Sequence, residues 1–313
     1  MAGLRFGKGT APRHPGGGSG SGASTSTTPS SLGAGRGFGA RVAPTIKTLL
    51  EGGKHIAILG ATGCGKTSLA KLLCSMAPRP VVPVVIDWDG EYTDLGLPIH
   101  EPPFMLPTVD IATLLSNLER PPDGGHGISF AVLATKTTSM TELVRELERL
   151  ASGYGILASW AQAALARAAV IKKYFFFTDA DKEISISCVY DLSSIPERER
   201  AIVQQALATA LVIARVPGAR SPLLLVIEEG AMGSTEHYLK DLVVLSRRRN
   251  IKLLWISQSL PPEELLPNFV LFLGDPGPLR HEWSRLLGLP LPRLGRGEFL
   301  AYDGKTVRKV RVT

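Results

Sequence analysis

Cysteine is scarce in this chain of 313 residues, which contains three of them. Cys64, Cys74 and Cys188 lie far apart, so no two have the spacing of a metal-binding or redox-active pair. The sequence therefore excludes chemistry that depends on paired cysteines. Few cysteines also agree with a reducing compartment.

Long apolar runs are missing too. A membrane-spanning helix needs about 20 consecutive apolar residues, but the longest candidates are interrupted by Gln162 and Arg167, or by Gln204 and Gln205. The N-terminus has no apolar signal core either. We therefore expect a soluble, cytoplasmic protein with no membrane insertion. With 44% hydrophobic residues, the chain can still bury one large α/β core.

Acidic residues are absent before Glu51, although this stretch carries basic ones. Glycine, serine, threonine and proline dominate between Gly7 and Gly39, so this segment has almost nothing to bury. We predict a disordered basic tail over residues 1–43, which could touch nucleic acid or only aid solubility, and a folded domain over residues 44–313. The net charge of +7 indicates either an anionic partner such as nucleic acid or a basic, soluble surface.

The strongest positive signal is a glycine-rich motif that matches G-x-x-x-x-G-K-[ST] in full. It lies between an apolar run at 56–59 and a helix-like segment at 68–73, which predicts a strand, a phosphate-binding loop and a helix. Lys66 would place its charge on the β- and γ-phosphates, and the Thr67 hydroxyl would be a ligand of Mg²⁺. The predicted nucleotide-binding residues are Gly60, Ala61, Thr62, Gly63, Cys64, Gly65, Lys66, Thr67 and Ser68.

Two further predicted strands end in carboxylates, where parallel α/β sheets place their chemistry. The first covers residues 83–87 and ends in Asp87, and the second covers residues 222–229 and ends in Glu228 and Glu229. Glu228 would hold Mg²⁺ through water, and Glu229 would polarise the attacking water. Neighbouring residues of a strand face opposite ways, so the two carboxylates cannot share one role. Each alone could also simply end an ordinary strand.

A later apolar segment, residues 251–256, predicts another strand, followed by Gln258. If this strand neighbours the phosphate-loop strand, Gln258 would sense the γ-phosphate or position water. Arg247, Arg248 and Arg249 end the helix-like segment before it. One of them could be an arginine finger for a neighbouring subunit, which requires a ring or a dimer. They could instead stabilise the dipole of their own helix.

With these motifs in order, the chain resembles the HerA and FtsK superfamily of hexameric ATPases, and archaeal HerA-like proteins in particular. The resemblance extends over roughly residues 44–313, with residues 291–299 similar to a closing hairpin. The motifs that carry it are Gly60 to Thr67, Ile86 to Tyr92, Tyr190 to Ser193, Ile227 to Gly230, and Ser246-Arg247 leading to Ser257-Gln258.

This resemblance implies an α/β fold with a RecA-like (ASCE) P-loop NTPase core. We expect a mostly parallel central sheet with flanking helices, a helical insertion at 93–190 and a C-terminal β hairpin. The implied protein is a hexameric ring that hydrolyses ATP with Mg²⁺ and translocates double-stranded DNA. Such a helicase-like, DNA-stimulated ATPase could serve repair, packaging or DNA transfer, with a nuclease or other machinery as a partner.

Three departures from the superfamily pattern limit what can be carried over. The N-terminal barrel usual in HerA proteins is replaced by the predicted tail, which puts docking of a nuclease in doubt. Gly230 and Ala231 stand where alanine and histidine often follow the acidic pair. The arginine-rich helix end is shortened, and Arg247 is the best choice for the finger.

Several alternatives stay open from sequence alone. Asp87 and Glu91 could orient water, Mg²⁺ or a neighbouring subunit, or serve structure. Two basic clusters are candidates for contact with DNA, or are ordinary solvated surface; they are Arg167, Lys172 and Lys173 next to Tyr174, and Lys305, Arg308, Lys309 and Arg311. The function could also be a motor that moves protein, as in the related type IV secretion ATPases, or a nucleotide-gated assembly scaffold.

Overall fold

The computed structural model describes residues 4–6, 48–107, 109–116, 118, 127–135, 140–178, 187–215, 219, 221–230 and 236–312. Most of the predicted tail, residues 1–43, lies outside these residues. One piece of it is described: strand β1 (Leu4–Phe6) pairs antiparallel with the last strand of the chain. The composition of the tail gives no hint of this strand.

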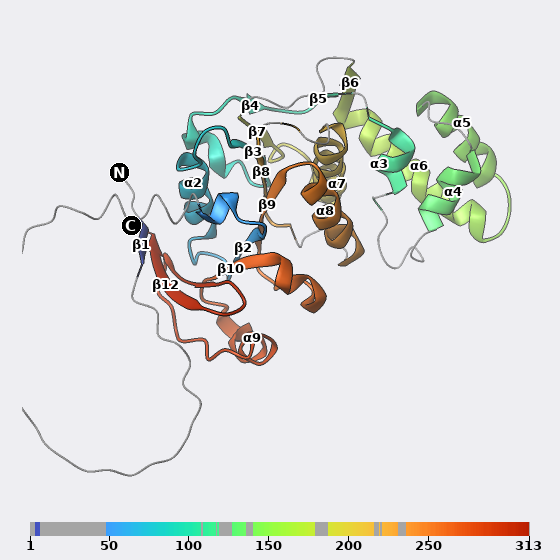
Figure 1. Ribbon diagram of the computed structural model, residues 1–313. Coiled ribbons are helices and arrows are strands. Elements are labelled where there is room, and N and C mark those ends of the chain that lie inside the picture. The colour runs from blue at the N-terminus through green and yellow to red at the C-terminus, as the bar shows by residue number, and fades with distance from the viewer. Residues whose placement is uncertain are drawn as a thin grey trace, which may run out of the picture.

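Ten strands of the described chain form one sheet, in the order β1-β12-β11-β10-β2-β9-β8-β3-β7-β4 (Figure 1). All neighbouring pairs from β10 to β4 are parallel, whereas β11, β12 and β1 add an antiparallel extension. The strands are β2 His55–Leu59, β3 Val82–Asp87, β4 Ile99–His100, β7 Cys188–Asp191, β8 Leu223–Ile227, β9 Ile251–Ser257, β10 Phe269–Leu273, β11 Glu298–Tyr302 and β12 Val307–Val312. The expected mostly parallel sheet and C-terminal hairpin are confirmed.

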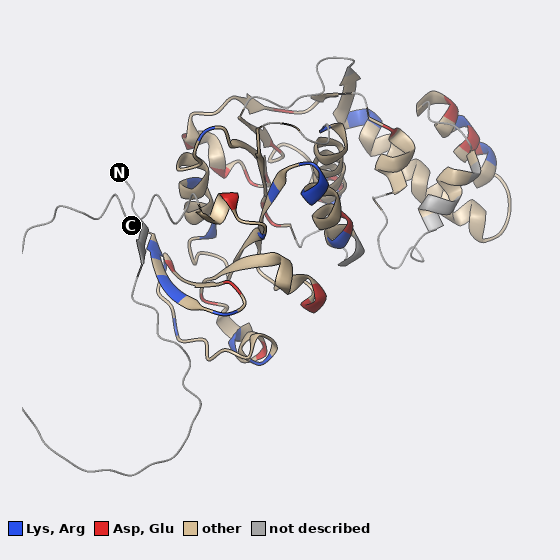
Figure 2. Ribbon diagram, in the orientation of Figure 1, with Lys and Arg blue, Asp and Glu red and all other residues tan. Residues whose placement is uncertain are grey.

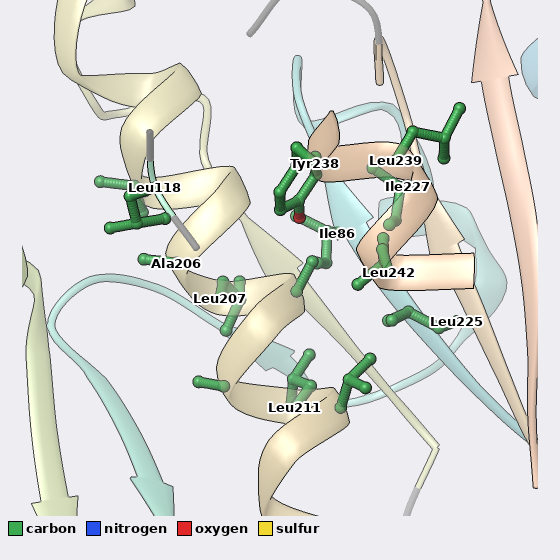
Figure 3. Close-up of a cluster of buried hydrophobic side chains, with 14 of the residues drawn as sticks. Ile86, Leu118, Ala206, Leu207, Leu211, Leu225, Ile227, Tyr238, Leu239 and Leu242 are labelled. Carbon is green, nitrogen blue, oxygen red and sulfur yellow. The ribbon is translucent and has the colours of Figure 1, made fainter. Parts of the chain in front are cut away.

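Central strands of this sheet are apolar along their whole length because helices cover both faces. Every residue of β2, β3 and β8 is buried. Helix α2 (Lys66–Ser75) packs on one face, and α7 (Glu197–Ala214) and α8 (Glu236–Arg248) pack on the other. Figure 3 shows Leu207 and Leu211 of α7 and Leu242 of α8 beside Ile86 and Leu225 of the strands.

A helical lobe projects from one end of the sheet, between β3 and β7 in the chain (Figure 1). Its elements are β5 Phe104–Pro107, α3 Ile111–Ser116, α4 Gly127–Thr135, α5 Met140–Ala151, α6 Ile156–Tyr174 and β6 Phe175–Thr178, with β5 and β6 forming a separate parallel pair. The expected helical insertion is thus present. It is narrower than the predicted 93–190, because β4 and β7 belong to the main sheet.

The C-terminal hairpin begins later than the resemblance suggests. Residues 291–297 precede it as an irregular segment, and the hairpin itself consists of β11 and β12. Asp303 fixes its turn by accepting hydrogen bonds from the backbone N–H groups of Lys305 and Thr306. Short elements complete the chain: η1 Glu91–Leu95, η2 Glu263–Asn268, η3 Gly277–Leu279 and α9 Arg280–Leu287. No helix in the described ranges is long and apolar enough to cross a membrane.

Candidate nucleotide-binding site

The glycine-rich motif forms a loop between β2 and α2, as its sequence predicts. Its three glycines adopt positive φ angles of 153° at Gly60, 80° at Gly63 and 104° at Gly65. Side chains rarely tolerate such angles, and glycine adopts them freely. At Gly60 a Cβ atom would also lie 2.6 Å from the Cys64 Sγ atom. Cys64 is buried inside the curl of the loop, where it fills space, and its burial raises the pKa of its thiol.

Two segments from the C-terminal part of the chain hold this loop in place. The Ala61 N–H donates to the Asp275 carbonyl at 2.8 Å, just beyond the end of β10. On the other side, the Gly297 N–H donates to the Cys64 carbonyl at 2.8 Å. Sequence reasoning missed both supports. The signal that could have found them is the pair of glycine-rich turns at 274–277 and 295–297, since one follows a strand next to β2.

Lys66 and Thr67 open helix α2 with their side chains directed at the loop and the sheet. Lys66 is 7% exposed, and its Nζ donates to the carbonyls of Gly60 at 3.0 Å and Ala61 at 3.3 Å. The Thr67 hydroxyl donates to Glu228 Oε1 at 2.8 Å. These contacts place a buried ammonium and a hydroxyl next to a carboxylate at the N-terminus of a helix, where backbone N–H groups favour anions.

Glu228 directly follows β8 and is 5% exposed. Burial, together with the negative charges of Asp87 and Glu91, raises its pKa to about 8, against the lowering effect of the Thr67 hydrogen bond. Its Oε2 atom is buried without a hydrogen-bond partner among the described residues. The backbone carbonyl of Glu228 accepts a hydrogen bond from the buried Gln204 side chain of α7, which helps to position Glu228. In the sequence, the only sign of this contact is a polar residue within an apolar helix.

This arrangement fits a divalent cation bound together with phosphate. An unpartnered buried carboxylate oxygen and a hydroxyl are the hard oxygen ligands that Mg²⁺ prefers, and Mg²⁺ usually completes its shell with water and substrate phosphates. Among the described residues, no group of three or more His, Cys, Asp or Glu side chains could hold a metal ion without other ligands. Thr67 and Glu228 stay the side chains predicted to hold Mg²⁺ together with water and phosphate.

Glu228 and Glu229 both lie in a turn just after β8, and Glu229 is more exposed than the buried Glu228. The φ of 46° at Glu229 is in the left-handed region and turns its side chain toward β9. There Gln258 Nε2 lies 3.4 Å from Glu229 Oε1. Because β9 pairs with β2, both groups emerge beside the phosphate loop. The next residue must be glycine, since a Cβ at Gly230 would lie 2.6 Å from the Trp255 ring.

The carboxylate of Asp87 holds the backbone of the turn after β3. Asp87 is fully buried, and its carboxylate accepts the N–H groups of Gly90, Glu91 and Tyr92 at 2.8 to 3.1 Å. These bonds fix the turn from β3 into η1. The side chain of Glu91 is exposed at the start of η1.

Arg247 lies at the opposite edge of the sheet from the phosphate loop. Its guanidinium donates a hydrogen bond to the Asn268 side chain at 2.8 Å. Asn268 directly precedes β10, and the first residue of β10 pairs with the first residue of β2. Strand β2 has five residues, which span roughly 16 Å at about 3.3 Å each. Arg247 therefore cannot reach the loop of its own subunit. Arg248 is also exposed, whereas Arg249 accepts a hydrogen bond from the buried Arg215 through its carbonyl.

The two basic clusters differ in their surroundings. Arg167 is buried and donates to the carbonyls of Leu118 and Ala163, so it belongs to the packing of the helical lobe. Lys173 pairs with Glu199 at 2.8 Å. On β12, Arg308 and Arg311 are exposed, and Lys309 pairs with Glu298 at 2.9 Å; Figure 2 shows blue, basic positions along this strand. The first cluster is thus a poor candidate for gripping phosphates.

A cavity of about 520 Å³ adjoins the loop where helix α2 begins. Gly65, Ser68, Leu72, Arg296 and Val312 are among the residues that line it. Because the backbone of a phosphate loop cradles the α- and β-phosphates, a nucleoside attached to them would extend into a cavity beside the loop. The cavity therefore has the position and size for a nucleoside.

Comparison with known proteins agrees with this geometry. Residues 46–126 match the family model described as "Helicase HerA, central domain". This segment holds the phosphate loop, β3 and the turn fixed by Asp87. This part of the chain is therefore similar to the central domain of a HerA helicase. No curated protein gives a match.

Solved structures show a similar fold at low identity. The chain is similar to VirB4 of Thermoanaerobacter pseudethanolicus, with 15% identity, a TM-score of 0.58 and coverage of 83% of this chain and 89% of that chain. It is also similar to the plasmid coupling protein TrwB in complex with ADP and Mg²⁺, with 17% identity, a TM-score of 0.51 and coverage of 82% and 77%. The RecA-like fold class expected from the sequence is thereby confirmed.

Proposed function

We propose that this protein is an ATP-driven motor of the HerA/FtsK kind that translocates double-stranded DNA. The observation that carries the ATPase part is the joint placement of the phosphate loop, the Thr67–Glu228 pair and the Glu229–Gln258 pair at one sheet edge. A protein that only binds nucleotide has no need of the second pair. The plasmid coupling protein TrwB, solved with ADP and Mg²⁺ on a similar fold, supports nucleotide and Mg²⁺ as the ligands.

In this proposal each side chain has one task. Lys66 exchanges its contacts with the Gly60 and Ala61 carbonyls for the β- and γ-phosphates. Thr67 and Glu228 hold Mg²⁺, which supplies charge neutralisation when bound. Glu229 accepts a proton from the attacking water, and Gln258 orients that water from the neighbouring strand. The 520 Å³ cavity holds the nucleoside, with Arg296 in its lining.

The position of Arg247 supports a ring rather than a monomer as the active form. Its exposed guanidinium lies at the sheet edge away from its own phosphate loop, so it is free to act only on a neighbouring subunit. A cation that reaches the γ-phosphate in trans would neutralise charge in the transition state and couple turnover to assembly. We therefore propose a homo-oligomer, and a hexamer by resemblance to the superfamily.

We propose double-stranded DNA as the cargo because the chain is basic and because a protein of similar fold is named a plasmid coupling protein. The chain has a net charge of +7, and β12 presents basic side chains to solvent. TrwB, which has a similar fold, is named a plasmid coupling protein, and this name supports DNA as the cargo. A nuclease or other machinery partner, and a cytoplasmic site of action, are part of the same proposal.

ATP turnover measured with and without linear double-stranded DNA, across a salt series, tests this function. Stimulation by DNA that weakens as salt rises, in a particle of hexamer mass, is the expected result. Turnover that ignores DNA would contradict the DNA assignment and favour the protein-moving alternative. Absence of turnover in an assembled, nucleotide-bound particle would instead favour a scaffold.

A further inference from the structure

A second cavity adjoins the other end of the phosphate loop, beyond the C-terminal end of β10. It measures about 740 Å³, and its charged lining consists of Asp275, Arg280, His281 and Arg293. Gly277 on its wall lies so close to the loop that a Cβ there would be 3.6 Å from the Ala61 side chain. Two guanidinium groups thus face one carboxylate in a cavity next to the nucleotide site.

The donors of this cavity are only partly satisfied. Arg280 donates through Nη2 to Asp275 Oδ1 at 2.7 Å, but its Nε atom is buried and has no partner among the described residues. Arg293 is exposed and forms no hydrogen bond or ion pair with any other described residue. Its charge still acts on Asp275, because the Gly277 N–H hydrogen bond and the charges of Arg280 and Arg293 together lower the pKa of that carboxyl group. Guanidinium groups beside a cavity can donate paired hydrogen bonds to an anion that enters it.

Asp275 joins this cavity to the phosphate loop. Its backbone carbonyl accepts the Ala61 N–H at 2.8 Å, while its carboxylate holds Arg280 and the Gly277 N–H. An anion that draws Arg280 away from the carboxylate would therefore act on the residue that supports the loop.

We propose that this cavity is a second anion site, which binds one phosphate group between Arg280 and Arg293 and reports its presence to the phosphate loop through Asp275. Guanidinium groups suit phosphate because they donate paired hydrogen bonds to its oxygens. The phosphate comes from a DNA backbone or from inorganic phosphate. The DNA source rests on the proposed function; the binding of phosphate itself does not.

The test uses Arg293→Ala, because this exposed side chain can be removed without disturbing the core. Arg285→Ala is the matched control, since Arg285 is an exposed arginine of the same helix region that does not line the cavity. With the nucleotide site filled by ADP and Mg²⁺, inorganic phosphate is titrated calorimetrically. In parallel, a short linear duplex is titrated by fluorescence anisotropy over a salt series.

We expect Arg293→Ala to weaken the binding of phosphate by about tenfold, or to lower the salt slope of DNA binding by about one, with little change in Arg285→Ala. If Arg293→Ala loses affinity only for inorganic phosphate, the free ion is the ligand of the cavity. If it loses affinity for DNA, the ligand is a phosphate of the DNA backbone. Equal losses in both variants, or no loss in either titration, would overturn the proposal. These readouts require no ATP turnover, so they stand apart from a failure of the proposed function.

Asp275→Asn supplies an independent check. The substitution keeps the backbone carbonyl that supports Ala61 but removes the charge that competes for Arg280. If the cavity binds phosphate, its affinity should rise several-fold, since Arg280 is released to the anion. Weaker or unchanged phosphate binding would mean that the Arg280–Asp275 pair is purely structural, and would contradict the proposal.

Discussion

Replacing Glu228 by glutamine should make the protein more stable in the absence of metal and nucleotide while removing its affinity for Mg²⁺. The reason is the buried position of this carboxylate beside Asp87, which raises its pKa from 4.5 to about 8. Between these two pH values the folded protein keeps a proton that the unfolded chain has lost. Stability therefore falls as pH rises through this window and becomes level above it. Glutamine keeps the shape of the protonated acid and an oxygen that can accept the Thr67 hydrogen bond, but it does not titrate.

The magnitude follows from the same shift. Neutral pH lies about 2.5 pH units above the ordinary pKa of glutamate, and each pH unit corresponds to about 1.4 kcal/mol. Burial of Glu228 therefore lowers the free energy of unfolding by roughly 3 kcal/mol at pH 7. Glu228→Gln should recover most of it. For a domain of this size, each 1 kcal/mol raises the Tm by about 2–4 °C, which makes the gain several degrees.

The assay is thermal unfolding of wild type and Glu228→Gln in EDTA at pH values from 5 to 8. The two Tm curves should nearly coincide near pH 5 and separate progressively toward pH 8. In a second measurement, Mg²⁺ with ADP should raise the Tm of wild type but not that of the variant. A variant less stable than wild type at pH 7, or a Tm difference that does not depend on pH, would refute the reasoning about burial.

Other substitutions test other parts of the site. Glu229→Gln should still bind ATP and Mg²⁺, measured with a fluorescent analogue, yet lose turnover at least 100-fold; normal turnover would remove Glu229 from the role of base. When Arg247→Ala subunits are mixed into wild-type assemblies, turnover should fall by more than the fraction of variant subunits. Arg248→Ala subunits should lower turnover only in proportion to their fraction. Equal effects of the two variants would argue against Arg247 as the finger. Gly230→Ala should cost about 1–3 kcal/mol in urea unfolding, because its Cβ would lie 2.6 Å from the Trp255 ring, and an unchanged midpoint would contradict this clash.

Patterns that are local in the chain predicted much of this fold. The phosphate loop and the apolar strands at 83–87 and 251–256 have their own periodicity or turn chemistry, and the structure places them within a few residues of the expected bounds. The order of strands could be inferred only through the resemblance to a known superfamily. Secondary-structure propensity does not predict that β9 pairs with β2. This pairing brings Gln258, which follows β9, to the site.

Features that depend on long-range packing escaped the sequence. Asp87 looks like a catalytic carboxylate at a strand end, but three backbone N–H groups occupy it once η1 forms. Arg167 reads as a surface cation at a helix end, but carbonyls of the helical lobe enclose it. Asp275 carries no motif, and its importance follows only from the pairing of β10 with β2. The roles of Glu229, Gln258 and Arg247 stay predictions.

The measurement that tests the central claim most directly is phosphate release from ATP by the full chain, compared with Lys66→Ala under the same conditions. Lys66 is the buried cation of the phosphate loop, and its loss leaves the surrounding strands intact. Our account predicts Mg²⁺-dependent turnover in wild type and none above background in the variant. Turnover that survives in Lys66→Ala, or its absence from wild type that binds ATP and Mg²⁺ and has assembled on DNA, would contradict the account.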